Sequence, residues 1–519
     1  MGLLSTIIHA DQLFTGIPTA LLLLLVIRYT YRRFATPLAH APLAKTNNFW
    51  LAAFGLVPPP SNTTDKLSEF LIQVGQDRQQ TPVSVVWSIM GTPLVLVNTL
   101  KGIKDVLVEG QTKQKNMNPP TNVQRGNLIC FIQNLVFGGK SINNTIGEEW
   151  RWRRHVLLPP FQSRQLVPNL LPYVATRTKE LLDVFEENAN QSTALEVDEL
   201  FQNLTMDVIN FYLYGRGDLN YDMVGGRTNL KNEHLKLGLG FQSVEAWLPF
   251  GINHTNWAQR AFRPSRERLK DFIRDSLQDA LAEGAKKEDG VFQSVAACAY
   301  ASGKYDGKYE DLVNDMLSLT FAGYDTTAHT LAFCFSELAR HPDIQEQLFQ
   351  QVNAVLGPAP VDPASITADK LSQIPLLTAV YRETMRKYPA VAFIPVHVNH
   401  DTIVDGVVVP RGAEIWCNLR GLQMNQDVFP NPDEFNPFRW IRNNDHPDDK
   451  QHEFPDLSFT LGPHSCLGKN LAILELRTVI ACTINQFTMS LKPGNIIDTK
   501  IVLTTKPRNG VWVHFQKRK

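Results

Sequence analysis

Cysteine is scarce in this sequence, and charge of neither sign is in excess. Lys plus Arg and Asp plus Glu number 51 each, so the formal net charge is zero and no nucleic-acid partner is expected. The six cysteines are spread over 519 residues without close pairing, which argues against a disulfide framework and suits a reducing compartment. Because 43% of the residues are hydrophobic and 20% are charged, disorder is excluded for the chain as a whole.

Long apolar runs are missing beyond the N-terminal region. Residues 17–27 read IPTALLLLLVI, and a flank containing Arg28, Arg32 and Arg33 follows. A cleaved signal peptide carries its positive charge before the apolar run, whereas here the charge comes after it. The pattern therefore predicts a single membrane-spanning helix whose basic flank stays in the cytosol, with a buried core helix as the alternative.

The apolar run also sets the expected domain organisation. We expect residues 1–35 to form a membrane anchor and residues 36–50, which contain Pro37 and Pro42, to form a stiff connector. Residues 51–519 are expected to form one large domain, since no repeat or second-domain boundary interrupts them.

The periodicities favour a mainly helical α+β domain. Residues 310–340 carry a long helical period, and Pro342 is placed to open the next helix, which runs to Gly357. Residues 376–387 and 467–487 are also predicted to be helical. Strands are predicted only in short patches at residues 83–98, as a hairpin, and at residues 402–418. A doubly wound sheet is not expected, because the strands are few and scattered among long helices.

One cysteine stands in a distinctive frame. Residues 459–468 read FTLGPHSCLG, and the spacing Phe459, Gly462, Cys466, Gly468 would arise by chance about once in a thousand such chains. The glycines allow a tight turn whose amides can point at the sulfur, and a helical period begins just after Cys466. The positive end of a helix favours thiolate over thiol. A buried structural cysteine is the alternative here, and the other five cysteines are expected to be packing residues.

With this motif the sequence resembles the cytochrome P450 family, of the microsomal, membrane-anchored kind. The resemblance extends from about residue 45 to the C-terminus. It implies the P450 fold, and a haem (iron protoporphyrin) whose axial ligand is the thiolate of Cys466. It further implies a monooxygenase that uses O2 and lies at the endoplasmic reticulum membrane, with the catalytic domain in the cytosol.

Residues 322–327, AGYDTT, resemble the oxygen-activation motif of that family. The resemblance assigns proton delivery to Asp325 and Thr326, while the small residues Ala322 and Gly323 would let a ligand approach the helix closely. The alternative is a threonine that bonds back to its own helix, with Asp325 on a solvated face.

Three residues are implied as partners of the haem propionates. Trp150 and Arg154 match a helical Trp-x-x-x-Arg signature, and indole and guanidinium N–H groups are suitable donors to carboxylates. His464 is the third, and an amphipathic basic helix is the alternative for the first two. The arginine that the family places after Pro389 is missing, because Val396 and His397 stand there, so one propionate contact is left unassigned.

A structural network is implied by Glu383, Arg386 and Arg439. The first two lie at i and i+3 of a predicted helix, and Arg439 belongs to a segment that resembles the second arginine motif of the family. Another departure, Gln423-Met424 in place of a His-Arg pair, is expected to concern local packing.

The partners follow from what the chain does not contain. It has no nucleotide-binding segment, so the electrons are expected from NADPH through a membrane flavoprotein, NADPH–haemoprotein reductase. The surface of this chain that docks the reductase is expected to be a basic face, made of Arg151, Arg153, Lys469 and Arg477.

The substrate is expected to be a lipophilic small molecule that is hydroxylated or epoxidised. The apolar character of residues 130–136, residues 391–395 and a turn at Leu503-Thr504 suits a terpenoid, a polyketide or a fatty acid, in specialised-metabolite biosynthesis. The alternatives are a thiolate-haem isomerase or dehydratase that needs no O2, a fatty-acid or xenobiotic hydroxylase, and a non-enzymatic haem sensor. The Asp325-Thr326 pair argues against the isomerase.

Overall fold

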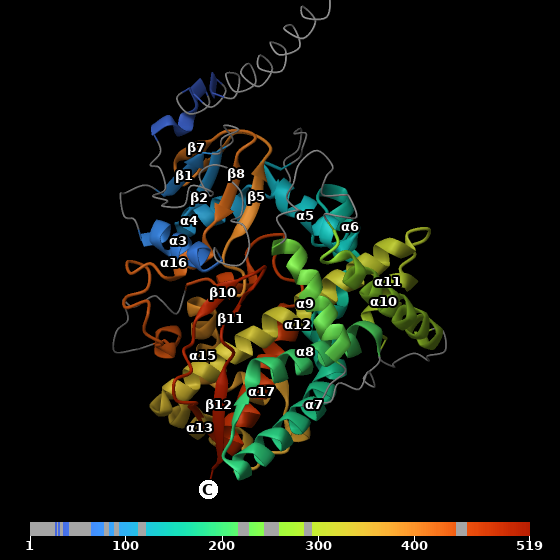
Figure 1. Cartoon of the computed structure of the whole chain (residues 1–519), viewed down its shortest axis with the longest axis vertical. Coiled ribbons are helices and arrows are strands. Elements are labelled where there is room, and N and C mark those ends of the chain that lie inside the picture. Colours follow the sequence, from blue (N-terminus) through green and yellow to red (C-terminus); the bar gives the residue numbers. More distant parts are fainter. Residues whose placement is uncertain are drawn as a thin grey trace, which may run out of the picture.

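A computed structural model of the chain describes residues 26–27, 30–31, 35–40, 64–76, 82–87, 93–112, 121–215, 228–242, 259–284, 293–442 and 454–518. Helices dominate, and the strands gather into small sheets (Figure 1). The α-helices are α3 (Thr64–Gln76), α4 (Leu100–Lys104), α5 (Asn127–Phe137), α6 (Gly147–Leu157), α7 (Ser163–Gln191), α8 (Val197–Tyr214), α9 (Thr228–Gln242), α10 (Arg263–Gly284), α11 (Val295–Ala301), α12 (Tyr309–Arg340), α13 (Pro342–Leu356), α14 (Ala368–Ser372), α15 (Pro375–Lys387), α16 (Leu419–Gln423) and α17 (Lys469–Gln486).

The largest sheet lies at one end of the molecule, away from the C-terminus (Figure 1). Its order is β1-β2-β8-β5-β3, and only the β2–β8 pair is parallel. The other sheets are the hairpins β6–β7 and β10–β11 and the three-stranded β4-β12-β9. The strands are β1 (Val83–Trp87), β2 (Pro93–Val97), β3 (Val123–Arg125), β4 (Ala194–Glu196), β5 (Ile394–Val398), β6 (Thr402–Val404), β7 (Val407–Val409), β8 (Glu414–Cys417), β9 (Phe487–Leu491), β10 (Thr499–Ile501), β11 (Thr505–Pro507) and β12 (Trp512–Lys517).

The predicted elements are confirmed where the structure describes them. Strands β1 and β2 pair antiparallel as the expected hairpin, although the turn at 88–92 lies outside the described residues. Residues 402–418 contain the hairpin β6–β7 and strand β8. The long helical period at 310–340 is α12, which begins one residue earlier than expected.

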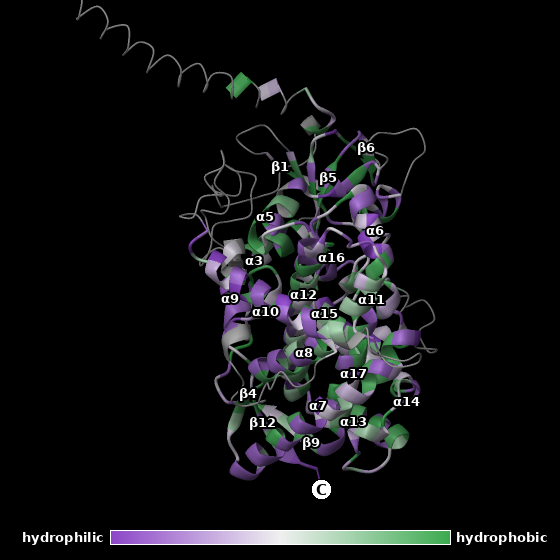
Figure 2. Cartoon of the chain, turned by 90° about the vertical axis from the view of Figure 1, so that its right-hand side faces the viewer, coloured by the Kyte–Doolittle hydropathy of each residue, from purple (hydrophilic) through white to green (hydrophobic). Residues whose placement is uncertain are grey.

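Helix α12 crosses the centre of the molecule and contacts α8, α10, α15 and α17 (Figure 1). Most of its side chains are buried, which explains why its apolar period is not confined to one stripe. In its middle, however, Ala322, Gly323 and Thr326 keep partly exposed surface. The outer helices α9 and α10 are largely hydrophilic by contrast (Figure 2).

The predicted membrane anchor falls almost wholly outside the described residues. Only Val26 and Ile27 of the apolar run are described, and both side chains are exposed. Across the ranges given above, no helix has the length and apolarity needed to cross a membrane. The connector is described only at residues 36–40, where Pro37–His40 form a 3-10 helix.

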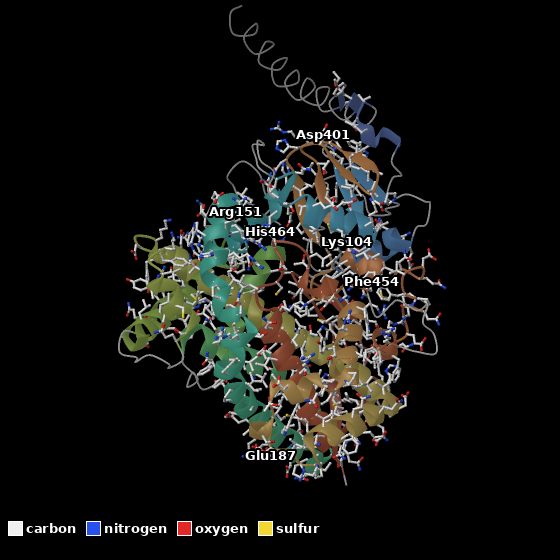
Figure 3. The ribbon with its side chains drawn as sticks, turned by 180° about the vertical axis from the view of Figure 1, so that it is seen from behind. Lys104, Arg151, Glu187, Asp401, Phe454 and His464 are labelled. Atoms are coloured by element: carbon white, nitrogen blue, oxygen red, sulfur yellow. The ribbon has the colours of Figure 1, made fainter. Side chains whose placement is uncertain are left out.

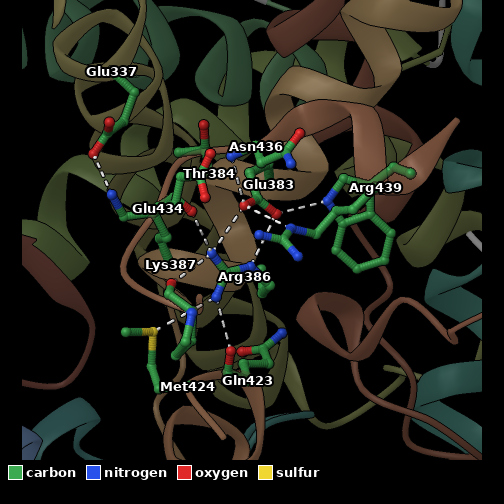
Figure 4. Close-up of polar contacts among 12 residues, drawn as sticks. Glu337, Glu383, Thr384, Arg386, Lys387, Gln423, Met424, Glu434, Asn436 and Arg439 are labelled. Carbon is green, nitrogen blue, oxygen red and sulfur yellow. Dashed lines mark hydrogen bonds and ion pairs between the residues drawn. The ribbon is translucent and has the colours of Figure 1, made fainter. Parts of the chain in front are cut away.

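The predicted charge network around Glu383 is confirmed (Figure 4). Arg386 donates two hydrogen bonds of 2.9 Å to the fully buried carboxylate of Glu383, and Arg439 donates a third at 3.1 Å. Trp440 adds an indole N–H at 2.8 Å, a contact that the sequence did not predict. Because the Glu383 carboxylate and both guanidinium groups are buried, loss of one of these three charges would leave an uncompensated charge, at a cost of ~3–5 kcal/mol.

The departure at Gln423-Met424 belongs to the same network. Arg386 donates to the Gln423 carbonyl at 2.9 Å and lies 3.7 Å from the Met424 sulfur. Further donations to the carbonyls of Pro432 and Glu434 fix the segment that leads toward Arg439. Gln423 contributes its backbone carbonyl, so the packing role expected for the departure is seen in the side chain of Met424.

Candidate functional site

The cysteine loop depends on a close backbone approach. Gly462 has φ +73°, and a Cβ atom there would lie 2.0 Å from the carbonyl oxygen of Leu107. Only glycine meets both conditions without displacing the loop. The amide of Cys466 donates to the Phe459 carbonyl at 2.9 Å, which closes the turn two residues before the N-cap of α17, Gly468.

Cys466 is the exposed member of the six cysteines, all of which the structure describes without a disulfide. Burial in the surrounding protein raises the pKa of its thiol, while the amide of Gly468 and the cations Arg154 and Lys469 lower it. The side chain is exposed, so its sulfur is accessible to a ligand. The amide and the cations are the groups that would stabilise a thiolate there. The predicted position at a helix N-terminus is confirmed.

The middle of α12 supplies the other partly exposed residues. Ala322 and Thr326 are one helical turn apart, and the Thr326 hydroxyl donates to the Ala322 carbonyl at 2.9 Å. The expected alternative, a threonine bonded within its own helix, is therefore the arrangement found. Gly323 meets another need, because a Cβ there would lie 2.7 Å from Ile209 of α8. The lack of a side chain at Gly323 therefore serves helix packing, and the approach of a ligand at this residue stays a prediction.

Asp325 is buried, so the expected alternative of a solvated face is wrong. Its carboxylate accepts a short hydrogen bond from the Thr504 hydroxyl and lies 3.3 Å from Nε2 of His329. The other ring nitrogen of His329 lies 2.6 Å from Asp198 on α8. Burial alone would raise the pKa of Asp325, but the His329 imidazolium holds it below its usual value. The sequence analysis missed this pair, although His329 stands one helical turn from Asp325.

The three predicted propionate partners lie together at α6 and the cysteine loop. The rings of Trp150 and His464 stack with centroids 3.8 Å apart. Arg154 donates to the backbone and the hydroxyl of Ser465, at 2.9 and 3.2 Å. Figure 3 shows His464 beside Arg151, the neighbour of Trp150 on α6.

The polar atoms of Trp150 and His464 suit an anionic guest. Nε1 of Trp150 and Nδ1 of His464 are buried and have no hydrogen-bond partner among the described residues. Burial and the neighbouring arginines Arg125, Arg154 and Arg151 lower the pKa of His464 to about 2, so its ring is neutral. Buried donors without partners are costly, and a carboxylate would satisfy them.

Arg125 is a further cation beside the predicted propionate partners, and the sequence did not predict it. It lies on β3 directly opposite Val396 of β5, the position where the family arginine is absent. Its guanidinium donates to the Ile142 carbonyl at 2.6 Å, and burial lowers its pKa to about 10. Arg125 is therefore still a cation at neutral pH, beside Arg154 and His464. No pattern in the sequence marks it, because its place depends on the register of two strands.

The chemistry of this donor set fits a haem. An accessible thiol with nearby cations suits an iron ligand, and indole, imidazole and two guanidinium groups suit two propionates.

One residue of the basic face expected to dock the reductase does not belong to that face. Arg153 is fully buried and pairs with Asp315 and Asp311 on α12, so it docks α6 to that helix and cannot meet a partner protein.

Comparisons with known proteins agree with the geometry. A family model described as cytochrome P450 matches residues 64–512. Cytochrome P450 4A10 of Mus musculus is 28% identical over 386 residues, which cover 72% of this chain and 73% of that protein. Cytochrome P450 3A12 of Canis lupus familiaris is 26% identical over 398 residues, covering 72% and 77%. The crystal structure of a cytochrome P450 (CYP102L1), at 18% identity, has the same fold with a TM-score of 0.73 over 89% of this chain and 100% of that one.

Proposed function

Since this chain belongs to the cytochrome P450 family and is a haem-dependent monooxygenase, we propose that it hydroxylates or epoxidises a lipophilic small molecule beside Cys466. When bound, the haem supplies the activation of O2, which places one oxygen atom on the substrate and releases the other as water. The observation that carries the proposal is the exposed Cys466 thiol: burial raises its pKa, while the Gly468 amide and the cations Arg154 and Lys469 lower it.

The Cys466 thiolate would hold the haem iron, and four side chains would hold the propionates. Trp150, His464, Arg154 and Arg125 come from α6, the cysteine loop and β3, so the haem would join three separate elements. Arg154 would have two roles, because besides a propionate it also binds Ser465, the residue directly before Cys466. The cations lower the free energy of the thiolate relative to the thiol.

Thr326 and Asp325 are proposed as the route for protons. The Thr326 hydroxyl now donates to Ala322, and it would have to turn away from that carbonyl to donate to a guest. Asp325 is tied to Thr504 and His329, so a proton would reach Thr326 by way of this buried group and of water. In this proposal the Asp325 side chain keeps its position during proton transfer, and the Thr326 hydroxyl changes its hydrogen-bond partner.

The electron donor and the location are proposed from the sequence. A reductase that carries electrons from NADPH would meet the face with Arg151, Lys469 and Arg477, now without Arg153. Anchoring at the endoplasmic reticulum membrane rests on the apolar run and its arginine flank. The substrate is proposed to belong to specialised metabolism, and hydroxylation of a fatty acid or a xenobiotic is the second candidate.

Reconstitution tests the proposal. The haem-loaded full chain is mixed with NADPH–haemoprotein reductase, NADPH and O2, and product, peroxide and NADPH consumption are measured against a lipophilic library. We expect an oxygenated product from at least one compound, at the expense of NADPH. Conversion of an oxygenated substrate without NADPH would instead support the isomerase, and inertness with an intact haem-thiolate spectrum would support a sensor.

A further inference from the structure

Two lysines face each other on the hairpin β10–β11. Lys500 is the direct cross-strand partner of Lys506, so both side chains lie on the same face. Like charges placed directly opposite are destabilising in an antiparallel pair. An anion between the two ammonium groups would reverse the sign of this interaction.

Lys506 has no hydrogen bond or ion pair within the described ranges. Burial lowers the pKa of its ammonium group, the carboxylate of Asp325 opposes this, and Lys500 adds to it. Asp325 is already held by Thr504 and by His329. A partly buried cation without a dedicated partner is costly, unless a ligand supplies the charge.

Both lysines line a cavity of about 490 Å³ between α9, α12 and the hairpin. Its apolar wall includes Phe321, Tyr324 and Leu503, and Phe321 directly precedes Ala322 of the oxygen-activation motif. Among the described residues that line it, Asp325 is the only acidic one. The cavity therefore joins an apolar wall beside the motif to a cationic end at the hairpin.

We propose that Lys506 and Lys500 bind the carboxylate of an amphipathic substrate in this cavity, with the apolar part of the molecule against Phe321 and Leu503. The inference rests on the proposed function and narrows its substrate class to lipophilic carboxylates. Two ammonium groups can each donate to one carboxylate oxygen, and charge-assisted bonds of this kind are strong. The Thr504–Asp325 bond fixes the hairpin turn to α12, so the anion is held at a set distance along the helix from Thr326.

The test compares dodecanoate with its methyl ester and with dodecanol, which share one apolar chain. Binding to the haem-loaded protein is measured by calorimetry and by the haem absorption shift. We expect dodecanoate to bind the wild type more tightly than the two neutral analogues. Lys506→Met and Lys500→Met should each lower the affinity for dodecanoate by about tenfold or more, while the affinity for the ester should change by less than about twofold. Lys506→Arg should keep most of the affinity, because it keeps the charge.

Lys104→Met, at an exposed lysine on α4, is the matched control and should change the affinity for neither dodecanoate nor the ester. An unchanged reduced, carbon monoxide-bound spectrum shows that each variant is folded with its haem. Equal affinities for dodecanoate and dodecanol in the wild type would overturn the inference, and so would equal losses for dodecanoate and ester in both variants. Inorganic phosphate is the competitor, and its binding as tightly as dodecanoate would overturn the substrate assignment in favour of a simple anion site.

A final arm separates the two proposals. Oxidation of the methyl ester with reductase and NADPH is followed in the wild type and in Lys506→Met. If both proteins oxidise the ester, and the wild type oxidises dodecanoate no faster than the ester, the inference fails while the monooxygenase function stands. If no compound of the set is oxidised although dodecanoate binds through the lysines, the site stands and the proposed reaction fails for this class.

Discussion

Arg125 lies directly opposite Val396 in the antiparallel pair of β3 and β5, so the two side chains share one face of the sheet. Val396 and His397 stand where the resemblance to the family would place an arginine. Arg125 is a cation on the neighbouring strand, beside Arg154 and His464. We propose that it supplies the propionate contact that the departure leaves unassigned.

We expect Arg125→Gln to hold haem less tightly. The variant keeps an amide donor but loses a cation, and a charge-assisted hydrogen bond contributes about 1.5–3 kcal/mol, which is roughly a tenfold to hundredfold change in affinity. The rate of haem transfer to an excess of apomyoglobin measures this directly. The rate of haem transfer from Arg125→Lys should lie between those of Arg125→Gln and the wild type. An unchanged rate in Arg125→Gln would show that Arg125 does not bind the haem.

Cys466→Ser should abolish the red-shifted absorption band that a thiolate gives to the reduced, carbon monoxide-bound haem. The serine hydroxyl stays protonated at neutral pH and cannot donate electron density in the same way. Cys298→Ser is the matched control, since Cys298 is also a free cysteine, is only partly exposed and belongs to α11. A band that survives in Cys466→Ser would show that another residue is the ligand.

Thr326→Ala should keep the haem spectrum and divert electrons from product to peroxide. Its hydroxyl is the one polar group of the partly exposed stripe Ala322, Gly323 and Thr326. The ratio of peroxide to NADPH consumed is the measurement, and it should rise severalfold. Thr326→Ser keeps the hydroxyl and should restore coupling, whereas equal coupling in the alanine variant would exclude proton delivery through Thr326.

Glu383→Gln should destabilise the protein strongly. The carboxylate is fully buried and accepts from Arg386, Arg439 and Trp440, so its loss leaves two buried cations uncompensated, at about 3–5 kcal/mol. Urea unfolding followed by fluorescence measures the change. Glu346→Gln is the control, because Glu346 is half exposed in its pair with Arg518 and should cost less than about 1 kcal/mol.

His329 should make stability depend on pH in the alkaline range. Burial alone would lower the pKa of this imidazole, but Asp198 and Asp325 raise it to about 10. In the unfolded chain the pKa is about 6.5, so the stabilisation is fully present below that pH and is lost as the pH rises through about 10. The pKa of Asp325 is lowered, so its contribution is constant in this range.

The comparison of wild type with His329→Gln measures that dependence. The difference in unfolding free energy should be constant at pH 6 and below and should shrink steadily toward about pH 10. A difference that stays constant between pH 6 and pH 10 would mean that the pKa of the His329 imidazole is not raised in the folded protein.

The sequence predicts most of what depends on local pattern. The period of residues 310–340, the proline that opens α13 and the glycine frame of Cys466 each specify their structure within a few neighbours. The network around Glu383 also follows from motifs, apart from Trp440. Strands β3, β4, β5 and β9–β12 were missed, because segments of three to six residues without clear alternation carry no period.

Long-range contacts account for the other differences. The roles of Arg125, Asp198 and Lys506 depend on strand register or helix packing that no local pattern encodes. Arg153 looks like a surface arginine in sequence, yet its partners on α12 lie far along the chain and bury it. Gly323 illustrates the same limit, since its neighbour Ile209 belongs to another helix.

The approach of Gly462 to the Leu107 carbonyl has a consequence for biosynthesis. The two residues come from opposite ends of the chain, so the ribosome releases Leu107 long before the loop that packs on it exists. The segment around Leu107 must stay uncovered until nearly the whole polypeptide has emerged, and such late non-local closure is slow and prone to aggregation. Haem capture is therefore expected only after translation is complete, and truncated nascent chains should remain empty and depend on chaperones.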